Sequence, residues 1–461
     1  MSRQKKNIVN LSQKLLFFLS PLVIIYLSIS LYFTNHFYYN SVINGINVSG
    51  QTIKEADNKI SSELEAYTLQ LHGRGNLNDE IKGQDIKLNY NSNGELEKLK
   101  KSQNPFTWFL GFLNKNTNVT MDIISYNEDL LNQYIDNLTY FNSENIVEPQ
   151  DATFECKNNK YNIVNEVVGT KINKEVLNKK IKEAIKNGDC ILDLEELGCY
   201  ENPKYTKDSP KVIETKDKLN SMIDFTVTYN IGDRKEVVDG DIISDWINVE
   251  DNLEINIDEG KVKEYVYRLA SKYNTFGSNR NFVTTDGSNI KVSGGNYGWI
   301  INQPKEVQEL MDNLKENKSI EREPIYSQTA VSREENDIGN TYVEIDMSKQ
   351  HMWFYKEGIL ITEGDVVTGN ASNNWSTPVG TYRLNYRERN ATLIGEDYSS
   401  SVNFWLPFNG NIGIHDATWR NEFGGEIYLT NGSHGCVNAP YEVAEAIFNN
   451  IEAGTPIICY Y

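Results

Sequence analysis

The side chain in this sequence best suited to covalent chemistry is Cys436, in the glycine-rich segment 431–440 that reads Asn-Gly-Ser-His-Gly-Cys-Val-Asn-Ala-Pro. A cysteine attacks carbonyl groups as the thiolate, so it needs a nearby base. His415 and His434 are both candidates for that base, in a chain with only 5 histidines. Gly435 lets the backbone turn sharply and bring N–H groups toward a substrate carbonyl. The alternative is a buried cysteine that packs as a small apolar side chain.

The residue pattern around this cysteine changes at about residue 341, where short alternating or aromatic-rich runs begin. These runs predict strands at 342–346, 351–355, 359–361, 380–384, 402–406 and 412–415. A helix is predicted just after the cysteine, at 441–451, because apolar residues recur there at intervals of three and four. The sequence therefore predicts a mainly β domain over 338–461, with Cys436 in the turn before its helix.

Three motifs follow one another along this domain. They are Thr-Pro-Val-Gly-Thr at 377–381, His-Asp and Trp-Arg within 415–420, and Ser-His-Gly-Cys-Val-Asn at 433–438. Together they resemble the catalytic domain of the L,D-transpeptidases, also called the YkuD fold. One position departs from the commoner pattern, because many members carry Arg where this chain has Asn438, although a subgroup with Asn is known. The resemblance implies attack on peptidoglycan stem peptides, release of the terminal D-alanine, and transfer of the acyl group to an amine of a neighbouring stem.

The resemblance also implies a role for each residue of the motifs. Cys436 matches the nucleophile and His415 the general base, because a histidine can both take and return a proton near neutral pH. Asp416, through its carboxylate or its backbone carbonyl, would hold the imidazole tautomer. The N–H groups of Gly435 and Cys436 would stabilise the oxyanion. Asn438 is assigned to substrate binding, with bracing of the backbone as the other role.

The neighbouring residues have more than one reading. His434 is either structural, part of the oxyanion hole or directly catalytic, because side chains adjacent in sequence need not converge. The hydroxyl of Ser433 is expected to stabilise the turn, with catalysis as the alternative. Trp419 and Arg420 are predicted to shape the substrate pocket, although Trp419 could instead stack in the core. The segment 383–408 lies between the motifs and is a candidate lid over the cleft, or an ordinary surface loop.

The first 33 residues predict a membrane anchor. The run 15–33 has 19 residues without a charge, which is about the length of a helix that crosses a bilayer. Four basic residues and no acidic residue precede it, so 1–14 is predicted to be a cytoplasmic tail. A cleaved signal peptide is the alternative, but no A-x-A-like site follows the run. We therefore expect a single-pass protein of the cell membrane, with its catalytic domain outside and facing the wall.

Between the anchor and the catalytic domain, a glycine-containing strand or turn is followed three times by an amphipathic helix. The apolar positions of these helices begin at Ile53, Leu177 and Val307 and recur at intervals of three and four. The pattern predicts a divergent α+β unit used more than once. The predicted modules cover 43–119, 121–205 and 221–325, with polar linkers at 206–218 and 326–340.

The first two predicted modules resemble the peptidoglycan-binding modules found ahead of some wall transpeptidases. The likeness rests on Asn-Gly-Ile-Asn-Val-Ser-Gly at 44–50, on 85–90, and on parts of 151–200. The segment 221–325 departs further from that pattern, and for all three the alternative is a spacer that binds nothing. The predicted fold class is thus α+β modules followed by a mainly β, YkuD-like catalytic domain, with an N-terminal transmembrane helix.

Charge and cysteine usage limit the partners. The formal net charge of −19 argues against nucleic acid, which requires a basic face. The 5 cysteines have neither disulfide-framework nor zinc spacing, although Cys156, Cys190 and Cys199 could pair, and Cys459 is expected to be a packed thiol. No metal and no cofactor are expected. The expected partners are peptidoglycan stem peptides as acyl donor and acceptor, the cytoplasmic membrane, and carbapenem-type β-lactams as acylating inhibitors.

These observations predict a membrane-anchored L,D-transpeptidase that forms 3→3 cross-links through a cysteine thioester. Within the same family, an L,D-carboxypeptidase or a transferase that attaches wall proteins would differ only in the acyl acceptor. A non-catalytic wall-binding protein is a further alternative, because so much of the chain lies outside the catalytic domain. A sortase-like enzyme is also a Cys/His transpeptidase, but it lacks the Ser-His-Gly-Cys phrase.

Overall fold

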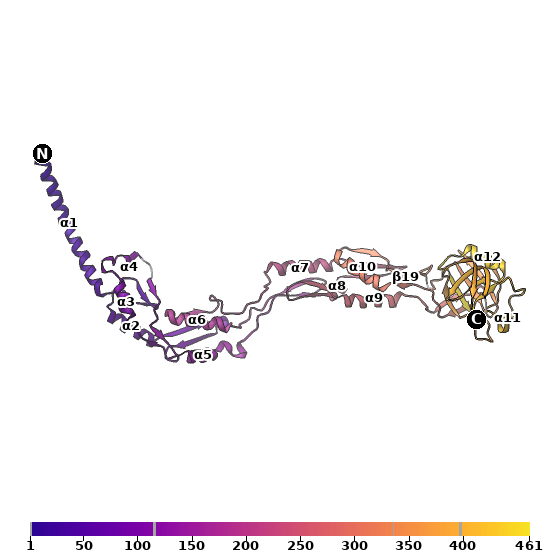
Figure 1. Cartoon of the computed structure of the whole chain (residues 1–461), viewed down its shortest axis with the longest axis horizontal. Helices are drawn as coiled ribbons and strands as arrows, with labels where there is room; N and C mark the ends of the chain where they lie inside the picture. Colours follow the sequence, from indigo (N-terminus) through magenta and orange to yellow (C-terminus); the bar gives the residue numbers. More distant parts are fainter. Residues whose placement is uncertain (1, 114–116, 335, 396–398) are drawn as a thin grey trace. The chain divides into compact units, whose positions relative to one another are not determined.

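The computed structural model describes residues 2–113, 117–334, 336–395 and 399–461, and Figure 1 gives the element labels used below. Parts of four predicted segments lie outside the described residues: 1 in the tail, 114–116 in the first module, 335 in the second linker and 396–398 in the lid. The chain divides into two compact units. Unit 1 comprises Met1–Thr153 and Ile163–Val212, and unit 2 comprises Phe154–Asn162 and Ile213–Tyr461.

The N-terminal segment folds as one helix, α1 (Ser2–Asn35), with Pro21 inside it. In the part of the chain that the structure describes, no helix combines the length and the apolar character needed to cross a membrane. The structure therefore supports a helix over the predicted segment 15–33, but it does not support a transmembrane helix there.

The first core of unit 1 packs α2 against short strands and α3. Its elements are β1 (Ser41–Ile43), β2 (Ile46–Asn47), α2 (Ile53–Glu65), β5 (Asn89–Tyr90), α3 (Glu95–Ser102), α4 (Leu110–Leu113), β6 (Thr117–Val119) and β7 (Ile124–Ser125). Thr52 and Glu55 form a capping box that starts α2. The predicted apolar positions Ala56, Ile60 and Leu64 are the buried face of this helix.

The second core of unit 1 crosses the boundary predicted between the first two modules. It contains β3 (Thr68–His72), β4 (Asn78–Lys82), α5 (Glu128–Asp136), α6 (Lys174–Asn187) and β10 (Ile191–Asp193). Strand β3 pairs antiparallel with β4 and parallel with β10, with Leu71 opposite Leu192. The predicted division into 43–119 and 121–205 is therefore wrong, because strands from both segments form one sheet. We call residues 67–153 and 163–205 module 1. The strands β8 (Thr153–Cys156) and β9 (Tyr161–Val164) lie on the segment between these ranges, and their residues Phe154, Cys156 and Tyr161 pack in the core of unit 2.

Module 2, residues 210–328, repeats this arrangement. Its elements are α7 (Pro210–Ile223), β11 (Val227–Ile231), β12 (Arg234–Val238), α8 (Gly240–Trp246), β13 (Ile247–Val249), β14 (Ile255–Ile257), α9 (Glu259–Tyr273), β15 (Arg280–Val283), β16 (Asn289–Val292), β17 (Ile300–Ile301), α10 (Gln303–Glu316), β18 (Ile320–Arg322) and β19 (Tyr326–Gln328). Its sheet order β12-β11-β18 matches β4-β3-β10, again with one antiparallel and one parallel pairing. The predicted linker at 206–218 is partly wrong, because α7 begins within it.

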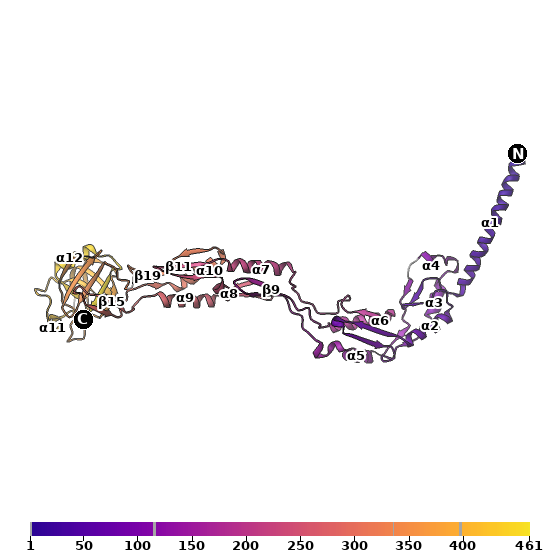
Figure 2. The same ribbon diagram turned by 180° about the vertical axis from the view of Figure 1, so that it is seen from behind.

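A hairpin of module 2, formed by β15 and β16, packs on the catalytic domain (Figure 2). Phe282 and Val292 share a small core with Ile458 and Tyr460. A buried ion pair between Arg280 Nε and Asp337 Oδ1, 2.6 Å apart, fixes the chain where it enters that domain. The predicted linker at 326–340 is therefore not a loose connection.

The catalytic domain is built on two sheets with helix α12 beside them. One sheet has the order β22-β21-β20-β28-β23, and the other has the order β24-β25-β26-β27. The elements are β20 (Tyr342–Asp346), β21 (His351–Lys356), β22 (Ile359–Asp365), β23 (Gly380–Arg383), β24 (Glu388–Ile394), β25 (Ser399–Asn409), β26 (Ile412–Asp416), α11 (Ile427–Asn431), β27 (Val437–Ala439), α12 (Tyr441–Asn450) and β28 (Pro456–Tyr460). One core joins both sheets and α12, and the thiol of Cys459 is fully buried in it. The prediction of a mainly β domain is confirmed.

Candidate active site

The turn that presents Cys436 is held by hydrogen bonds of its own. Ser433 Oγ donates to Cys436 O at 2.6 Å and accepts from the Gly435 N–H at 3.0 Å. Gly435 has φ +114°, and a Cβ there would lie 3.1 Å from Ile412, so this position favours glycine. The hydroxyl of Ser433 thus stabilises the turn. Because the Gly435 N–H is already engaged, the expectation that it helps to form an oxyanion hole is not supported in this conformation.

Cys436 is covered by the hairpin of β24 and β25 and is only 7% exposed. Its apolar neighbours are Ala391, Leu393, Val402 and Trp405. The prediction that segment 383–408 lies over the reactive residue therefore agrees with the structure for the described part of that segment. The cover is apolar, so it separates the thiol from bulk water.

Burial sets the protonation state of the thiol. Loss of solvation raises the pKa of Cys436 to about 11, and a hydrogen bond from the Gly413 backbone acts in the opposite direction. The Sγ atom donates to Asn411 O at 3.5 Å. Near neutral pH the resting residue is therefore the neutral thiol, and its attack on a carbonyl requires a base to take the proton.

His415 and Cys436 are both neighbours of Trp405, which pairs with His415 across the sheet and shares an apolar cluster with Cys436. Strand β26 runs parallel to β27 with His415 opposite Asn438, and Cys436 lies two positions before Asn438. Side chains two residues apart in a strand point to the same face of the sheet, so all three lie on one face. No hydrogen bond joins the thiol and the imidazole among the described residues.

The imidazole of His415 is oriented as a general base requires. Its Nδ1 lies 2.9 Å from the backbone oxygen of Asp416, and a carbonyl only accepts, so Nδ1 carries the proton and Nε2 keeps its lone pair. Burial lowers the pKa of His415, the hydrogen bond to Asp416 O and the charge of the Asp416 carboxylate raise it, and the charge of Arg420 lowers it. With the pKa below its ordinary value, the ring is neutral at pH 7.

The backbone carbonyl and the side-chain carboxylate of Asp416 have different partners. The backbone carbonyl orients His415, whereas the carboxylate accepts hydrogen bonds from Asn403 N, Asn403 Nδ2 and Phe404 N at 2.8 to 2.9 Å. These bonds fix β25, the strand that carries part of the cover over Cys436. The buried carboxylate therefore positions the lid and does not hold the imidazole.

His434 and Trp419 have different surroundings. His434 is exposed, and its ring stacks on Trp375 with centroids 4.1 Å apart. Trp419 is 50% exposed, and its ring centroid lies 5.9 Å from that of His415. The expectation of a core tryptophan at 419 is wrong, because the loop after β26 is at the surface. His415 thus lies in the strand that pairs with β27, whereas His434 lies at the surface.

Arg420 and Asn438 each have a buried polar atom that makes no hydrogen bond in the described structure. Arg420 Nη2 donates to Asn431 O at 2.9 Å, but its buried Nε has no hydrogen-bond partner in the described structure. Asn438 is buried, its backbone pairs with Val367, and its Oδ1 likewise lacks a described partner. Unsatisfied buried polar atoms are uncommon in folded proteins, so both side chains are candidates for substrate contact.

Sequence reasoning missed two parts of the site. Trp405 covers Cys436, and Asn403 binds the carboxylate of Asp416. Both lie in a run recognised only as a strand from its alternation. No local signal identifies their role, because it arises when β25 pairs with β26 and places Trp405 opposite His415.

The comparisons with known families agree with this geometry. The family described as the L,D-transpeptidase catalytic domain matches residues 340–459. The family described as "Putative peptidoglycan binding domain" matches residues 80–190 and 207–321. The second of these matches includes most of the segment predicted to be the most divergent module. No curated protein matches the chain.

Solved structures of L,D-transpeptidases resemble the chain as well. It is 32% identical to a cysteine-to-serine variant of the Enterococcus faecium L,D-transpeptidase, over 54% of this chain and 100% of that one, with a TM-score of 0.46. It is also 32% identical to the Ldtfm-avibactam carbamoyl enzyme, over 54% and 99%, with a TM-score of 0.47. It is 41% identical to the E. faecium L,D-transpeptidase catalytic domain acylated by ertapenem, over 26% and 98%, with a TM-score of 0.25. The chain belongs to the L,D-transpeptidase family, with a YkuD catalytic domain preceded by peptidoglycan-binding domains.

Proposed function

We propose that this L,D-transpeptidase forms 3→3 cross-links between peptidoglycan stems through a thioester on Cys436. The observation that carries the proposal is the pairing of β26 with β27, which sets a neutral thiol and a neutral imidazole on one face. The free lone pair on His415 Nε2 gives that face a base, and the hairpin of β24 and β25 gives it an apolar cover.

Acylation in this proposal begins with transfer of the thiol proton. His415 Nε2 takes the proton of Cys436 as sulfur attacks the carbonyl of the third stem residue, forming a C–S bond and an oxyanion. Collapse of this intermediate breaks the C–N bond to the terminal D-alanine, whose amine leaves with the proton from His415. The Cys436 N–H is the backbone donor of the turn that we assign to the oxyanion, because the Gly435 N–H donates to Ser433.

Transfer follows the same path in reverse. The amine of a second stem loses a proton to His415 as it attacks the thioester carbonyl, and the new intermediate expels the sulfur of Cys436. The sulfur recovers a proton from His415, and an amide joins the two stems. The apolar neighbours of Cys436 support transfer over hydrolysis, because they restrict water at the thioester.

Arg420 is suited to the terminal carboxylate of the donor stem. In a tetrapeptide stem that carboxylate lies one residue beyond the attacked carbonyl, so its partner must be close to the catalytic pair. Arg420 affects the pKa of His415 through its charge, and no acidic side chain pairs with it among the described residues. A guanidinium with unused N–H donors binds a carboxylate well. We therefore assign Arg420 to recognition of the free stem terminus.

We also propose that the catalytic domain acts outside the cytoplasm, where its substrate is found. The sequence supports this location through the uncharged run 15–33 and the basic residues before it. Cell fractionation and protease treatment of intact spheroplasts test the location. Digestion of the catalytic domain in intact spheroplasts is expected, and full protection of this domain would contradict the proposal.

Product analysis tests the proposed reaction. The purified full chain is incubated with disaccharide-tetrapeptide, and mass spectrometry is expected to detect a cross-linked dimer that has lost one D-alanine. Cys436→Ala should abolish the dimer, whereas Cys190→Ala, which changes an exposed free cysteine of unit 1, serves as the matched control. A product that is only hydrolysed tripeptide would favour the carboxypeptidase. An undiminished dimer yield from Cys436→Ala would contradict the thioester.

A further inference from the structure

The two helices that flank the hairpin in module 1 have direct equivalents in module 2. Helix α5 begins after the capping residue Asn127 and α9 after Asp258, and buried residues follow at the same spacing in both. They are Leu131 and Ile135 in α5, and Val262 and Val266 in α9. Helices α6 and α10 likewise begin after Asn173 and Asn302, and four of their buried positions coincide. The repeat therefore allows a position-by-position comparison.

In module 1, three polar contacts join the exposed faces of α5 and α6. Lys174 pairs with Asp136 at 2.5 Å, and Lys182 pairs with Glu128 at 2.5 Å. Between them, Asn178 Nδ2 donates to Asn132 Oδ1 at 3.4 Å. These contacts follow one another in antiparallel order along the two helices. They therefore span the whole solvent-facing groove between the helices, which we call the seam.

In module 2, every one of these bridges has been replaced. The equivalent pairs are Gln303 with Tyr267, Val307 with Lys263, and Met311 with Glu259. Lys263 instead pairs with Glu259 of its own helix at 2.7 Å. No hydrogen bond or ion pair crosses from α9 to α10, both of which the structure describes in full. Apolar side chains of α9 and α10 still pack together, but no polar contacts close the solvent-facing seam between these helices.

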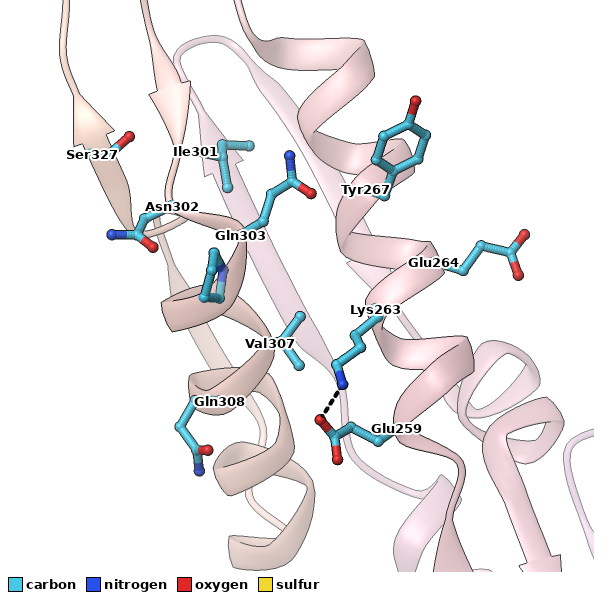
Figure 3. A pocket seen from close by; sticks show the side chains of 11 residues that line it. Glu259, Lys263, Glu264, Tyr267, Ile301, Asn302, Gln303, Val307, Gln308 and Ser327 are labelled. Atoms are coloured by element: carbon cyan, nitrogen blue, oxygen red, sulfur yellow. Dashed lines mark ion pairs between the residues drawn. The ribbon is translucent and has the colours of Figure 1, made fainter.

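The open seam is a pocket of about 900 Å³, seen in Figure 3. Its walls are the first halves of α9 and α10, and Ile301, Pro304 and Val307 supply apolar surface. Gln303 and Val307 extend from α10 toward α9. Tyr267 stands at the other side and is 61% exposed. A large exposed aromatic ring beside a pocket with polar groups is typical of a binding surface.

We propose that this pocket binds the glycan strand of peptidoglycan through its disaccharide repeat. The ring of Tyr267 offers a face for a sugar ring, and the apolar surface suits N-acetyl methyl groups. The amides of Asn302, Gln303 and Gln308 can each donate to and accept from hydroxyl and acetamido groups. A neutral glycan fits better than a stem peptide, because Lys263 is neutralised by Glu259 and the remaining charge, Glu264, would repel stem carboxylates.

This binding goes beyond acyl transfer and is measured without it. The full chain is titrated with soluble, uncharged β-1,4-linked oligosaccharides of N-acetylglucosamine, which carry no stem peptide and therefore lack the bond that Cys436 would attack. Isothermal titration calorimetry should detect saturable binding. Tyr267→Ala should weaken the affinity about tenfold, as expected for loss of an aromatic anchor. Tyr461→Ala, which removes a tyrosine that is 57% exposed at the chain end, is the matched control and should leave the affinity unchanged.

A second variant tests the seam itself and not only the ring. Tyr267→Asp combined with Gln303→Lys installs the Asp136–Lys174 pair of module 1 at the equivalent positions, and it should abolish binding while the thermal midpoint stays close to that of the parent. Unchanged glycan affinity in both variants would overturn the proposal. Binding of a free tetrapeptide stem that is lost in Tyr267→Ala, without binding of bare glycan, would also overturn it. Neither outcome depends on whether Cys436 is acylated.

Discussion

The proposed catalytic face, which carries Cys436 and His415, and the module 2 pocket differ in the exposure of their key side chains. Cys436 and His415 are 7% and 4% exposed, whereas Tyr267 is 61% exposed. Burial shifts the pKa of both groups that we propose to be catalytic, so their chemistry depends on their surroundings. Exposure leaves the chemistry of a side chain unchanged but makes its surface available to a large ligand. Substitutions on the catalytic face should therefore change rates with pH, and substitutions in the pocket should change affinity alone.

The two modules add a narrower lesson. Their buried helix positions coincide, and their sheets have one topology, so the shared framework is set by core residues. The seam between the helices differs at positions outside the shared buried set, namely Gln303, Val307 and Met311 of α10 and their counterparts in α6. A repeated fold can thus lose bridging contacts and open a pocket without changing its core.

The largest expected effect comes from removing the base. His415→Ala should slow acylation by the tetrapeptide on the order of 10² or more at pH 7, because the neutral thiol then has no proton acceptor. The deficit should shrink as pH rises toward the Cys436 pKa of about 11, where the thiolate forms without help. The parent rate should fall only at acid pH, below the lowered pKa of His415. A deficit that stays constant across pH would contradict this role, and near-normal rates would point to His434.

The apolar cover should control the acidity of the thiol. Trp405→Ala exposes Cys436 to water, so the pKa of Cys436 should fall from about 11 toward the ordinary thiol range. Ultraviolet absorbance of the thiolate during a pH titration measures this change. Tyr267→Ala should leave the same titration curve unmoved, which would separate the two regions. An unchanged pKa in Trp405→Ala would show that the cover does not set it.

Arg420 should contribute to binding of the donor stem only when the C-terminal carboxylate of that stem is free. Arg420→Gln should raise the KM for the tetrapeptide about tenfold, because a charge-assisted hydrogen bond is lost. The same substitution should hardly affect a tetrapeptide amide, and Arg420→Lys should recover part of the loss. Steady-state kinetics with both donors provide the measurement. Equal losses for acid and amide would indicate a structural role through the contact with Asn431 O.

The smallest expected effect is the loss of stability when an ion pair between α5 and α6 of module 1 is removed. Asp136→Asn removes the ion pair with Lys174, and both side chains are more than half exposed. Exposed pairs contribute little, so the free energy of unfolding of module 1 should fall by less than about 1 kcal/mol. Urea denaturation monitored by hydrogen exchange in α5 and α6 measures it. A loss of several kcal/mol would mean that the bridges hold the helix pair together, contrary to the comparison with module 2.

Periodicity and motifs predicted the catalytic domain well. Local patterns predict the strand at 342–346 and the helix after Cys436, and the structure contains both. These features depend on residues close together in the sequence, or on motifs that resemble a known family. The buried faces of α2, α6 and α10 were predicted for the same reason.

Long-range pairing could not be predicted from such patterns. Strand β3 pairs with β10 more than a hundred residues later, which invalidated the boundary near residue 120. The polar composition of 326–340 predicts a linker before the catalytic domain, but Asp337 forms a buried ion pair with Arg280. The roles of Asn403 and Trp405 likewise depend on a neighbouring strand. In each case the decisive partner lies on another element of the fold, so the local composition carries no signal of it.

The most direct test of the proposed function is to locate the acyl group. The full chain is incubated with disaccharide-tetrapeptide in the absence of an acceptor, quenched in acid and digested, and mass spectrometry identifies the modified peptide. The account predicts a disaccharide-tripeptide joined through a thioester to Cys436, with one D-alanine released for each adduct. An adduct on another residue, or release of D-alanine from a Cys436→Ala chain at the parent rate, would contradict it.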